Sequence, residues 1–152
     1  MTKETTSIQE EMMNLNKVSM LIKRGSLECE KIATPILGKY DITLSQFKIL
    51  KFLYNEPSAS VRLMDLEAFF SLTHPTAIGI VQNLEKKDLV TRIADVRHPR
   101  VRYIALTETG SALQTELTEA GNRIEAELTQ ELSDDERDQL IHLLQKMQGI
   151  KE

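Results

Sequence analysis

Apolar residues recur every three or four positions along most of the chain, which is the spacing of an amphipathic helix. Between residues 6 and 38 they are Ile8, Met12, Leu15, Val18, Ile22, Cys29, Ile32 and Ile36. The spacing predicts one long helix there, with a weak point or kink at Gly25-Ser26 and an end at Gly38. Thr43 is the expected cap of a second helix. Its buried side is predicted to carry Leu44, Phe47, Leu50, Leu53 and Tyr54.

The next two predicted helices are short and separated by a tight turn at Ser71-Leu72. Ser60 is the expected cap of the first and Thr73 of the second. Pro75 falls in the first turn of the second helix, where its missing N–H costs no hydrogen bond. This helix is expected to end near Lys87-Asp88. Its inward positions are predicted to be Ala77, Ile80 or Val81, and Leu84.

The apolar period then changes to that of strands. Two β-rich runs, 89–94 and 102–106, flank the turn-prone segment 95–100, which predicts a hairpin. A helix is expected from Thr107 to about Leu132, and Ser133 opens a Ser-x-x-Glu capping box for a last helix. The predicted order is α-α-α-α-β-β-α-α. A short capped helix followed at once by an arginine-bearing hairpin is typical of a winged helix-turn-helix, so the expected fold is mainly α with a small β-hairpin wing.

Length and composition fit a small soluble protein. The 152 residues suit one compact domain, or a small domain with appended helices. No run is long and apolar enough to cross a membrane, and the polar, acidic N-terminus does not resemble a signal peptide. The single cysteine, Cys29, allows no intramolecular disulfide. These features predict a cytoplasmic protein.

Positive charge is concentrated in one segment although the net charge is −4. Residues 71–102 contain six basic and three acidic side chains, whereas residues 103–152 contain four basic and eleven acidic ones. Four of the arginines fall between positions 92 and 102. A local excess of cations indicates an electrostatic surface for a polyanion, and double-stranded DNA is the expected partner.

The helix that begins at Thr73 has the residues of a DNA reader. A helix N-terminus offers N–H groups and partial positive charge to a phosphate, and a side-chain amide can pair with an adenine edge. Gly79 would let the helix backbone approach DNA closely. The predicted DNA-binding residues on this helix are Thr73, His74, Thr76, Gly79, Gln82 and Asn83. Thr73 can equally be a cap alone, Gln82 and Asn83 ordinary surface, and Ile78 can face a thymine methyl or the wing.

The loop of the hairpin supplies the second predicted contact. Arg97 and Arg100 bracket Pro99, and a guanidinium at such a tip suits a narrow minor groove. Asp95 is expected to orient the wing by pairing with an arginine side chain. The strand arginines, Arg92 and Arg102, are expected to pair with acidic neighbours instead. His98 is expected to be an ordinary exposed loop residue.

From about Leu44 to Gly110 the chain resembles the multiple-antibiotic-resistance regulator (MarR) family of bacterial transcription factors. The resemblance is carried by LSQFKIL, THPTAIGIVQNLEKKDLVTR, the Asp-and-Arg wing and IALTETG, in that order. It implies a homodimer that binds a near-palindromic operator and is often released by a small phenolic ligand or by cysteine oxidation. The family wing usually reads Asp-x-x-Asp-Arg-Arg, whereas this chain has His98 and Pro99 there. Gln82-Asn83 replaces a frequent acidic-basic pair, which implies a different base preference.

The chain is therefore predicted to be a single subunit, 1–152, with a winged helix-turn-helix lobe at 43–106. Residues 6–38 and 107–148 are predicted to form a helical dimerisation region. The apolar stripes at 8–22 and 140–147 favour burial against a twin subunit, with packing back onto the same chain as the alternative. We expect a homodimeric, sequence-specific transcriptional regulator, a repressor rather than an activator. A winged-helix protein-interaction adaptor without an operator is the alternative.

Sensing and catalysis have weaker signals. A pocket for a small aromatic effector is expected at Met20, Tyr40, Phe47 and Tyr54, with plain core packing as the alternative. Cys29 is expected to be buried and inert, because neighbouring glutamates disfavour a thiolate. The three histidines are scattered, so neither a metal nor another cofactor is expected. No phosphate loop or nucleophile–base pair is present, which argues against an enzyme.

Overall fold

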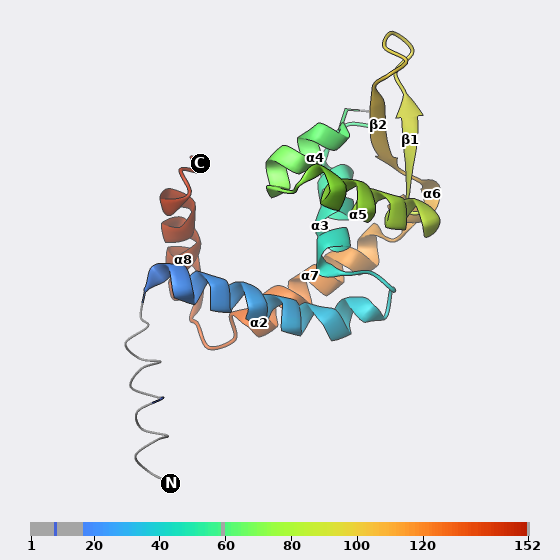
Figure 1. Ribbon diagram of the computed structural model, residues 1–152. Helices are drawn as coiled ribbons and strands as arrows, with labels where there is room; N and C mark the ends of the chain where they lie inside the picture. The colour runs from blue at the N-terminus through green and yellow to red at the C-terminus, as the bar shows by residue number, and fades with distance from the viewer. Residues whose placement is uncertain (1–7, 9–16, 59, 152) are drawn as a thin grey trace.

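The computed structural model describes residue 8 and residues 17–58 and 60–151 (Figure 1). Helix α2 spans Val18–Gly38, and the predicted start near Thr6 lies outside the described residues. The helix ends at Gly38 as predicted. The helix continues through Gly25-Ser26, so the expected weak point or kink does not interrupt it. Helix α3 spans Leu44–Asn55 and begins with the predicted cap, Thr43, which forms a capping box with Gln46.

Helix α4 spans Leu63–Phe70, but its first turn is not capped by Ser60. The Ser60 hydroxyl donates to the Pro57 carbonyl, and Arg62 takes the cap position. The Asp65 carboxylate accepts the Arg62 backbone N–H at 2.8 Å. The prediction of a Ser60 cap is therefore wrong, because the chain pairs with β2 at Val61 and Arg62 before the helix begins at Leu63.

Helix α5 spans His74–Lys86 and is capped by Thr73, whose side chain accepts the Thr76 N–H. Ala77, Val81 and Leu84 are its buried residues, so of the two inward alternatives Val81 is the buried one. Thr73 as cap and the end at Lys87 are confirmed.

The hairpin pairs β1, Val90–Ala94, with β2, Arg102–Leu106, in antiparallel register. Val90 lies opposite Leu106. The middle of β2 is joined to the segment before α4, because the Ile104 N–H donates to the Val61 carbonyl at 2.8 Å. An isolated bridge between Arg62 and Tyr103 continues this pairing.

The single helix expected from Thr107 to Leu132 is two helices. Helix α6 spans Glu108–Ala112 and helix α7 spans Gln114–Leu128. The first turn of α6 is held against the start of the hairpin, because the Thr107 N–H donates to the Leu89 carbonyl at 3.1 Å. Helix α7 instead runs along α2 (Figure 1). Helix α8, Asp134–Met147, has the predicted capping box of Ser133 and Glu136.

The core surrounds α3, which packs against α2, α5, α7 and β2. Its largest fully buried side chains are Leu37, Ile49, Leu50, Leu66, Val81, Leu84 and Leu117. Tyr54 was expected on the buried side of α3 but is 54% exposed, because it occupies the last turn, beyond the core. Helix α8 stands apart from the lobe (Figure 1), and none of its residues is buried. Within the described part of the chain, no helix is long and apolar enough to cross a membrane.

Candidate nucleic-acid interface

The first turn of α5 is exposed to solvent and its threonines are already bonded to each other. The Thr73 side-chain oxygen accepts the Thr76 backbone N–H at 3.4 Å, and its hydroxyl donates to that of Thr76 at 2.9 Å. Capping is therefore the observed role of Thr73. Both residues stay exposed, so the turn can still present its N–H groups and hydroxyls to an anion.

His74, the first residue of α5, is held by the preceding helix. Its Nδ1 lies within hydrogen-bonding distance of a carboxylate oxygen of Glu67 on α4, and the His74 side chain is 65% exposed. A carboxylate at Nδ1 fixes that nitrogen as the protonated one, which leaves Nε2 for an outside partner. Sequence reasoning missed Glu67, because the two residues meet only after the turn between α4 and α5 is formed.

The outward face of α5 carries polar side chains and a glycine. Gln82 and Asn83 are exposed, and a Cβ added at Gly79 would meet nothing within 4 Å. The backbone at Gly79 is therefore open to close approach from outside. The buried residues of α5 lie on the opposite side, so the residues predicted to read bases share the solvent-facing surface.

A groove of about 380 Å³ separates α4 and α5 from the hairpin. We call it the arginine groove. It is lined by Arg62, Leu63, Met64, His74, Ile78, Arg92, Arg100, Val101, Arg102 and Ile104. Ile78 lines this groove together with hairpin residues, which is consistent with the predicted placement beside the wing. Arg62 had no signal in the sequence, because only the folded lobe brings residues before α4 beside the wing.

Some of the arginines form ion pairs or hydrogen bonds with residues near them in the sequence. Arg92 pairs with Glu85 at 2.6 Å, as predicted for a strand arginine, and Arg62 pairs with Asp65 at 3.3 Å. The Arg62 backbone N–H and side chain both bond to Asp65 and lower the pKa of that carboxyl. Arg102 departs from the prediction, since its Nη1 donates to the Pro99 carbonyl at 2.8 Å rather than to a carboxylate.

The tip of the wing carries the arginines without such partners. Among the described residues, neither Arg97 nor Arg100 forms an ion pair or a side-chain hydrogen bond, and both are exposed. The tip is closed by a bond from the Val101 N–H to the His98 carbonyl at 2.8 Å. His98 is exposed, as expected. The wing therefore presents two guanidinium groups whose charge is not neutralised locally.

Asp95 shapes the wing, but not by pairing with an arginine side chain. Its Oδ1 accepts the Arg97 backbone N–H at 2.9 Å, and its Oδ2 accepts the Tyr103 hydroxyl at 3.2 Å. The bond from the Arg97 N–H is the main cause that lowers the pKa of Asp95, and the bond to Asp95 raises the pKa of Tyr103. The predicted partner was wrong because a carboxylate two residues from a turn N–H bonds to the backbone first.

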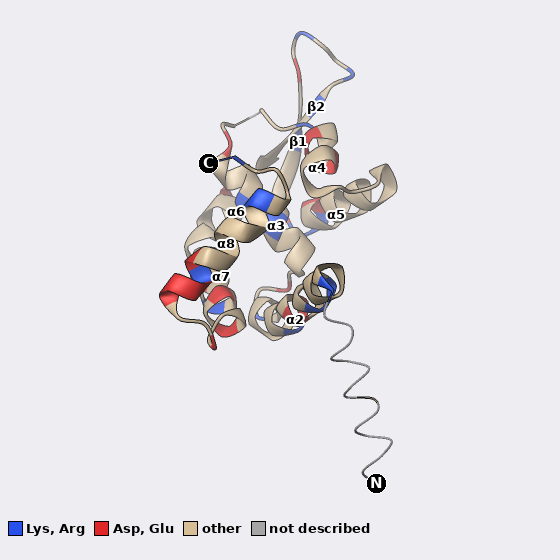
Figure 2. Cartoon of the chain, turned by 90° about the vertical axis from the view of Figure 1, so that its left-hand side faces the viewer, with Lys and Arg blue, Asp and Glu red and all other residues tan. Residues whose placement is uncertain are grey.

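Charged residues are unevenly distributed over the molecule (Figure 2). Lys and Arg lie on the loop of the wing and also on α2, whereas Asp and Glu gather on α7 and at the start of α8. This arrangement agrees with the local excess of cations in the sequence. The acidic end lies away from the surface formed by α5 and the wing (Figures 1 and 2), so it does not cancel the attraction of that surface for a polyanion.

The four residues expected to line an effector pocket are spread over the helices. The Phe47 ring lies against Gly121 on α7, and Lys39 lies over the ring of Tyr40. Tyr54 lines a separate cavity of about 170 Å³ beside β2, and Met20 is 40% exposed near the start of α2. Within one subunit, the rings of Phe47 and Tyr54 therefore lie in different environments.

Cys29 is half-buried against the core, and burial raises the pKa of its thiol. This environment disfavours the thiolate. The expected full burial of Cys29 is not found, and its lack of reactivity stays a prediction. No group of three or more His, Cys, Asp or Glu side chains within the described residues could hold a metal ion.

Comparison with known proteins places this geometry in a family. The family model described as the MarR family matches residues 42–100. The chain is 34% identical over 112 residues to the homoprotocatechuate degradative operon repressor of Escherichia coli, and the match covers 74% of each chain. It is 27% identical over 129 residues to the transcriptional regulator SarZ of Staphylococcus haemolyticus, covering 85% of each.

Solved structures agree. The MepR–DNA complex of S. aureus superposes with a TM-score of 0.78 at 30% identity, covering 88% of this chain and 97% of that one. Wild-type MarR from E. coli, without ligand, superposes with a TM-score of 0.75 at 25% identity, covering 88% and 98%. The relatives are transcriptional regulators and not enzymes. The hairpin is thus the wing of a winged helix-turn-helix, and the chain belongs to the MarR family of DNA-binding transcriptional regulators.

Proposed function

We propose that the protein is a homodimeric repressor that binds a near-palindromic operator. The outward face of α5 would enter the major groove, and Arg97 and Arg100 would reach the neighbouring minor groove or backbone. One observation carries this proposal: the polar face of α5 and the arginine groove lie side by side on one surface of the lobe. Arg62 joins the predicted contacts as a phosphate-binding candidate.

The dimer is supported by the apolar side chains that the single chain leaves uncovered. Helix α8 has no buried residue, yet its exposed side chains include Leu140, Ile141, Leu143 and Met147. Helix α2 exposes Val18, Leu21 and Ile22 in the same way. The exposed apolar stripes on α2 and α8 are best explained by burial against a second copy of the chain. We therefore assign residues 6–38 and 107–148 to a dimerisation region and 43–106 to the DNA-binding lobe.

Two lobes in one dimer explain how a small surface achieves useful affinity. One lobe offers few phosphate contacts, whereas two lobes about one helical turn apart engage both halves of a palindrome. Repression is proposed because the E. coli relative is named a repressor. A cytoplasmic location, where the chromosome lies, and release by a small aromatic effector complete the proposal.

The test begins with the duplex that the purified protein enriches from a random-sequence library. We expect a near-palindrome, and a gel-filtration mass of two subunits. Arg100→Ala should weaken binding about tenfold or more and reduce the dependence of log affinity on log salt by about 0.9 for each phosphate that the variant no longer neutralises. Arg123→Ala is the matched control, because Arg123 lies on α7 and pairs with Glu127.

Enrichment of no sequence at low salt, or a monomer at micromolar concentration, would contradict the proposal as a whole. Arg100→Ala with wild-type affinity and salt dependence would refute only the role of the wing. Release by an effector is tested with salicylate in the same binding assay, where a shift in affinity is expected.

A further inference from the structure

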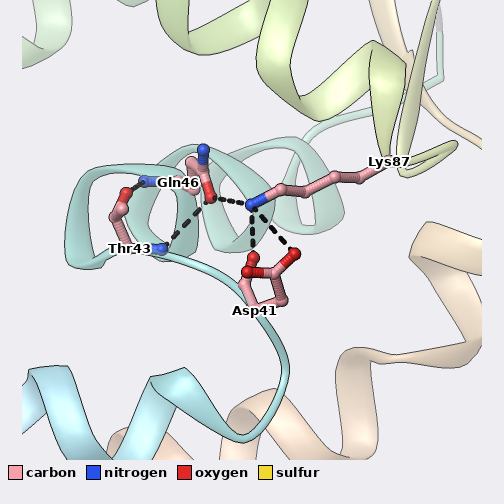
Figure 3. A network of polar contacts seen from close by, with 4 residues as sticks. All are labelled: Asp41, Thr43, Gln46 and Lys87. Carbon is pink, nitrogen blue, oxygen red and sulfur yellow. Dashed lines mark hydrogen bonds and ion pairs between the residues drawn. The ribbon is translucent and has the colours of Figure 1, made fainter.

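Lys87 links the end of α5 to the bend between α2 and α3 (Figure 3). It is the first residue after α5, and its side chain reaches back across the lobe. The Lys87 Nζ donates to the Asp41 backbone carbonyl and, at 3.1 Å, to Oε1 of Gln46. The Asp41 carboxylate lies 3.9 Å away. One ammonium group thus engages three oxygens that the bend and the first turn of α3 supply.

The acceptors of this ammonium are themselves held in place. Gln46 is 5% exposed, and its Oε1 also accepts the Thr43 backbone N–H at 3.1 Å. The Gln46 N–H bonds back to the Thr43 side chain. Asp41 has a positive φ of 55°, a conformation that a residue with a side chain rarely adopts. The bend therefore has one defined shape, and the Lys87 ammonium bonds directly to the carbonyl of its strained residue.

The two ends of this link belong to different parts of the proposed regulator. Helix α5, the reading helix, carries the predicted reading face with Gln82 and Asn83, and α2, which we call the arm, belongs to the proposed dimerisation region. The extensive packing of α5 is with α3, α4 and β1, all within the lobe. The bond of Lys87 to Gln46 adds to the contact with α3, and its bond to Asp41 reaches beyond these neighbours to the segment through which α2 enters the lobe. A change at Lys87 therefore acts on the angle between arm and reading helix, not on the reading face itself.

We propose that Lys87 is a positioning residue that fixes the orientation of α5 relative to α2 and so sets the half-site spacing that the dimer accepts. This inference rests on the proposed function, because spacing has a meaning only for a dimer on a palindrome. Inserting one base pair between half-sites shifts one of them by about 3.4 Å and rotates it by about 35° around the DNA axis. Lobes with one fixed orientation tolerate little of that change.

The population of correctly oriented dimers gives the size of the effect. If removal of the link leaves about one dimer in ten with both lobes correctly oriented, apparent affinity for the best duplex falls about tenfold. The same spread of orientations lets the dimer fit altered spacings. The expected signature is weaker binding to the best duplex together with a flatter dependence on spacing. Removing a side chain that touches DNA would instead weaken binding equally at every spacing.

Three variants test the inference. K87M removes the ammonium and keeps the length of the side chain, and K87R keeps a cation that can reach the same oxygens. K86M is the matched control: Lys86 is exposed in the last turn of α5, and K86M removes one positive charge without touching the link. Each is measured on the duplex that the wild type selects, and on derivatives with one or two base pairs inserted or deleted at the centre.

We expect one inserted base pair to weaken the wild type and K86M by about thirtyfold, but K87M by about threefold. K87R should restore the wild-type profile. A second measurement needs no DNA: spin labels at Asn83→Cys in a Cys29→Ser background report the distance between the two reading helices. K87M should broaden that distribution, and K86M should leave it unchanged.

An unchanged spacing profile or an unchanged distance distribution in K87M overturns the inference. If K87M does not fold by circular dichroism, K87Q takes its place, and failure of both to fold also overturns it in favour of a purely structural role. A wild-type protein that selects no palindrome or forms no dimer instead overturns the proposed function. The two failures are therefore distinguishable.

Discussion

Replacing Gly110 by alanine should destabilise the protein, although alanine is the better helix former. Gly110 lies in α6 and is buried where that helix crosses the start of the hairpin. An added Cβ would lie 2.1 Å from the Leu89 carbonyl oxygen and 3.3 Å from the Leu106 side chain. An ordinary contact begins near 3.4 Å, so the Leu89 carbonyl would have to move by 3.4 − 2.1 = 1.3 Å.

The size of the effect follows from what that movement breaks. The Leu89 carbonyl accepts the Thr107 N–H at 3.1 Å, so displacing it weakens the join between hairpin and α6. Overpacking costs about 1–3 kcal/mol, and the weakened hydrogen bond adds about 1 kcal/mol. The higher helix propensity of alanine offsets about 0.5–1 kcal/mol of this loss in unfolding free energy. The net expectation is a decrease in unfolding free energy of roughly 1–3 kcal/mol, or a melting temperature lower by about 2–12 °C for a chain of this length.

Gly25→Ala is the matched control, because Gly25 lies within α2 and a Cβ there would meet nothing within 4 Å. It should raise the free energy of unfolding by about 0.5–1 kcal/mol. Both variants are compared with the wild type by urea unfolding at equal subunit concentration, since dimerisation shifts apparent stability. If Gly110→Ala were as stable as Gly25→Ala, the close crossing of α6 and the hairpin would be refuted.

Three further outcomes are expected. Gly79→Ala should keep or raise the stability of the protein, because the added Cβ points into open space. It should weaken DNA binding by about tenfold, because that space lies on the predicted reading face. Unchanged binding would mean that α5 does not approach DNA at Gly79. The lowered pKa of Asp95 means that its contribution to wing stability is present above its unfolded pKa near 4 and is lost as pH falls through the folded value. Asp95→Asn should therefore abolish that acid dependence and lower the pKa of Tyr103, measured from phenolate absorbance after subtracting Tyr103→Phe. Leu143→Asp on α8 should yield monomers in gel filtration, and a dimer of wild-type mass would contradict the proposed role of α8.

The features that the sequence predicted well are local ones. Thr43, Thr73 and Ser133 each cap a helix by accepting an N–H three residues ahead, so a short window contains the whole interaction. The hairpin was predictable for the same reason, because its two strands are separated by one short loop. The positive charge of the wing needed only composition. Local signals therefore predicted the order of elements from α2 to the hairpin, but not the break between α6 and α7.

The features that were missed depend on segments far apart along the chain. Arg62 reaches the arginine groove because Tyr103 pairs beside it, and no sequence pattern connects the two. Lys87 bonds to Gln46, which is 41 residues earlier. Ser60 was a cap candidate by residue type, but the pairing of Arg62 with Tyr103 moves the start of the helix to Leu63, where Asp65 accepts the Arg62 N–H. Side-chain contacts of this kind appear only once α3, α4 and the hairpin have packed together.

The attachment of the wing at one end has a consequence for recognition. One main-chain hydrogen bond, from the Ile104 N–H to the Val61 carbonyl, attaches the strands of the hairpin to the lobe, whereas the described hydrogen bonds of residues 95–101 stay within the hairpin itself. In the proposed complex, a hairpin attached in this way would bring Arg97 and Arg100 to the backbone of many DNA sequences and so add attraction to them almost equally. Discrimination between one base pair and another would then fall mainly to helix α5.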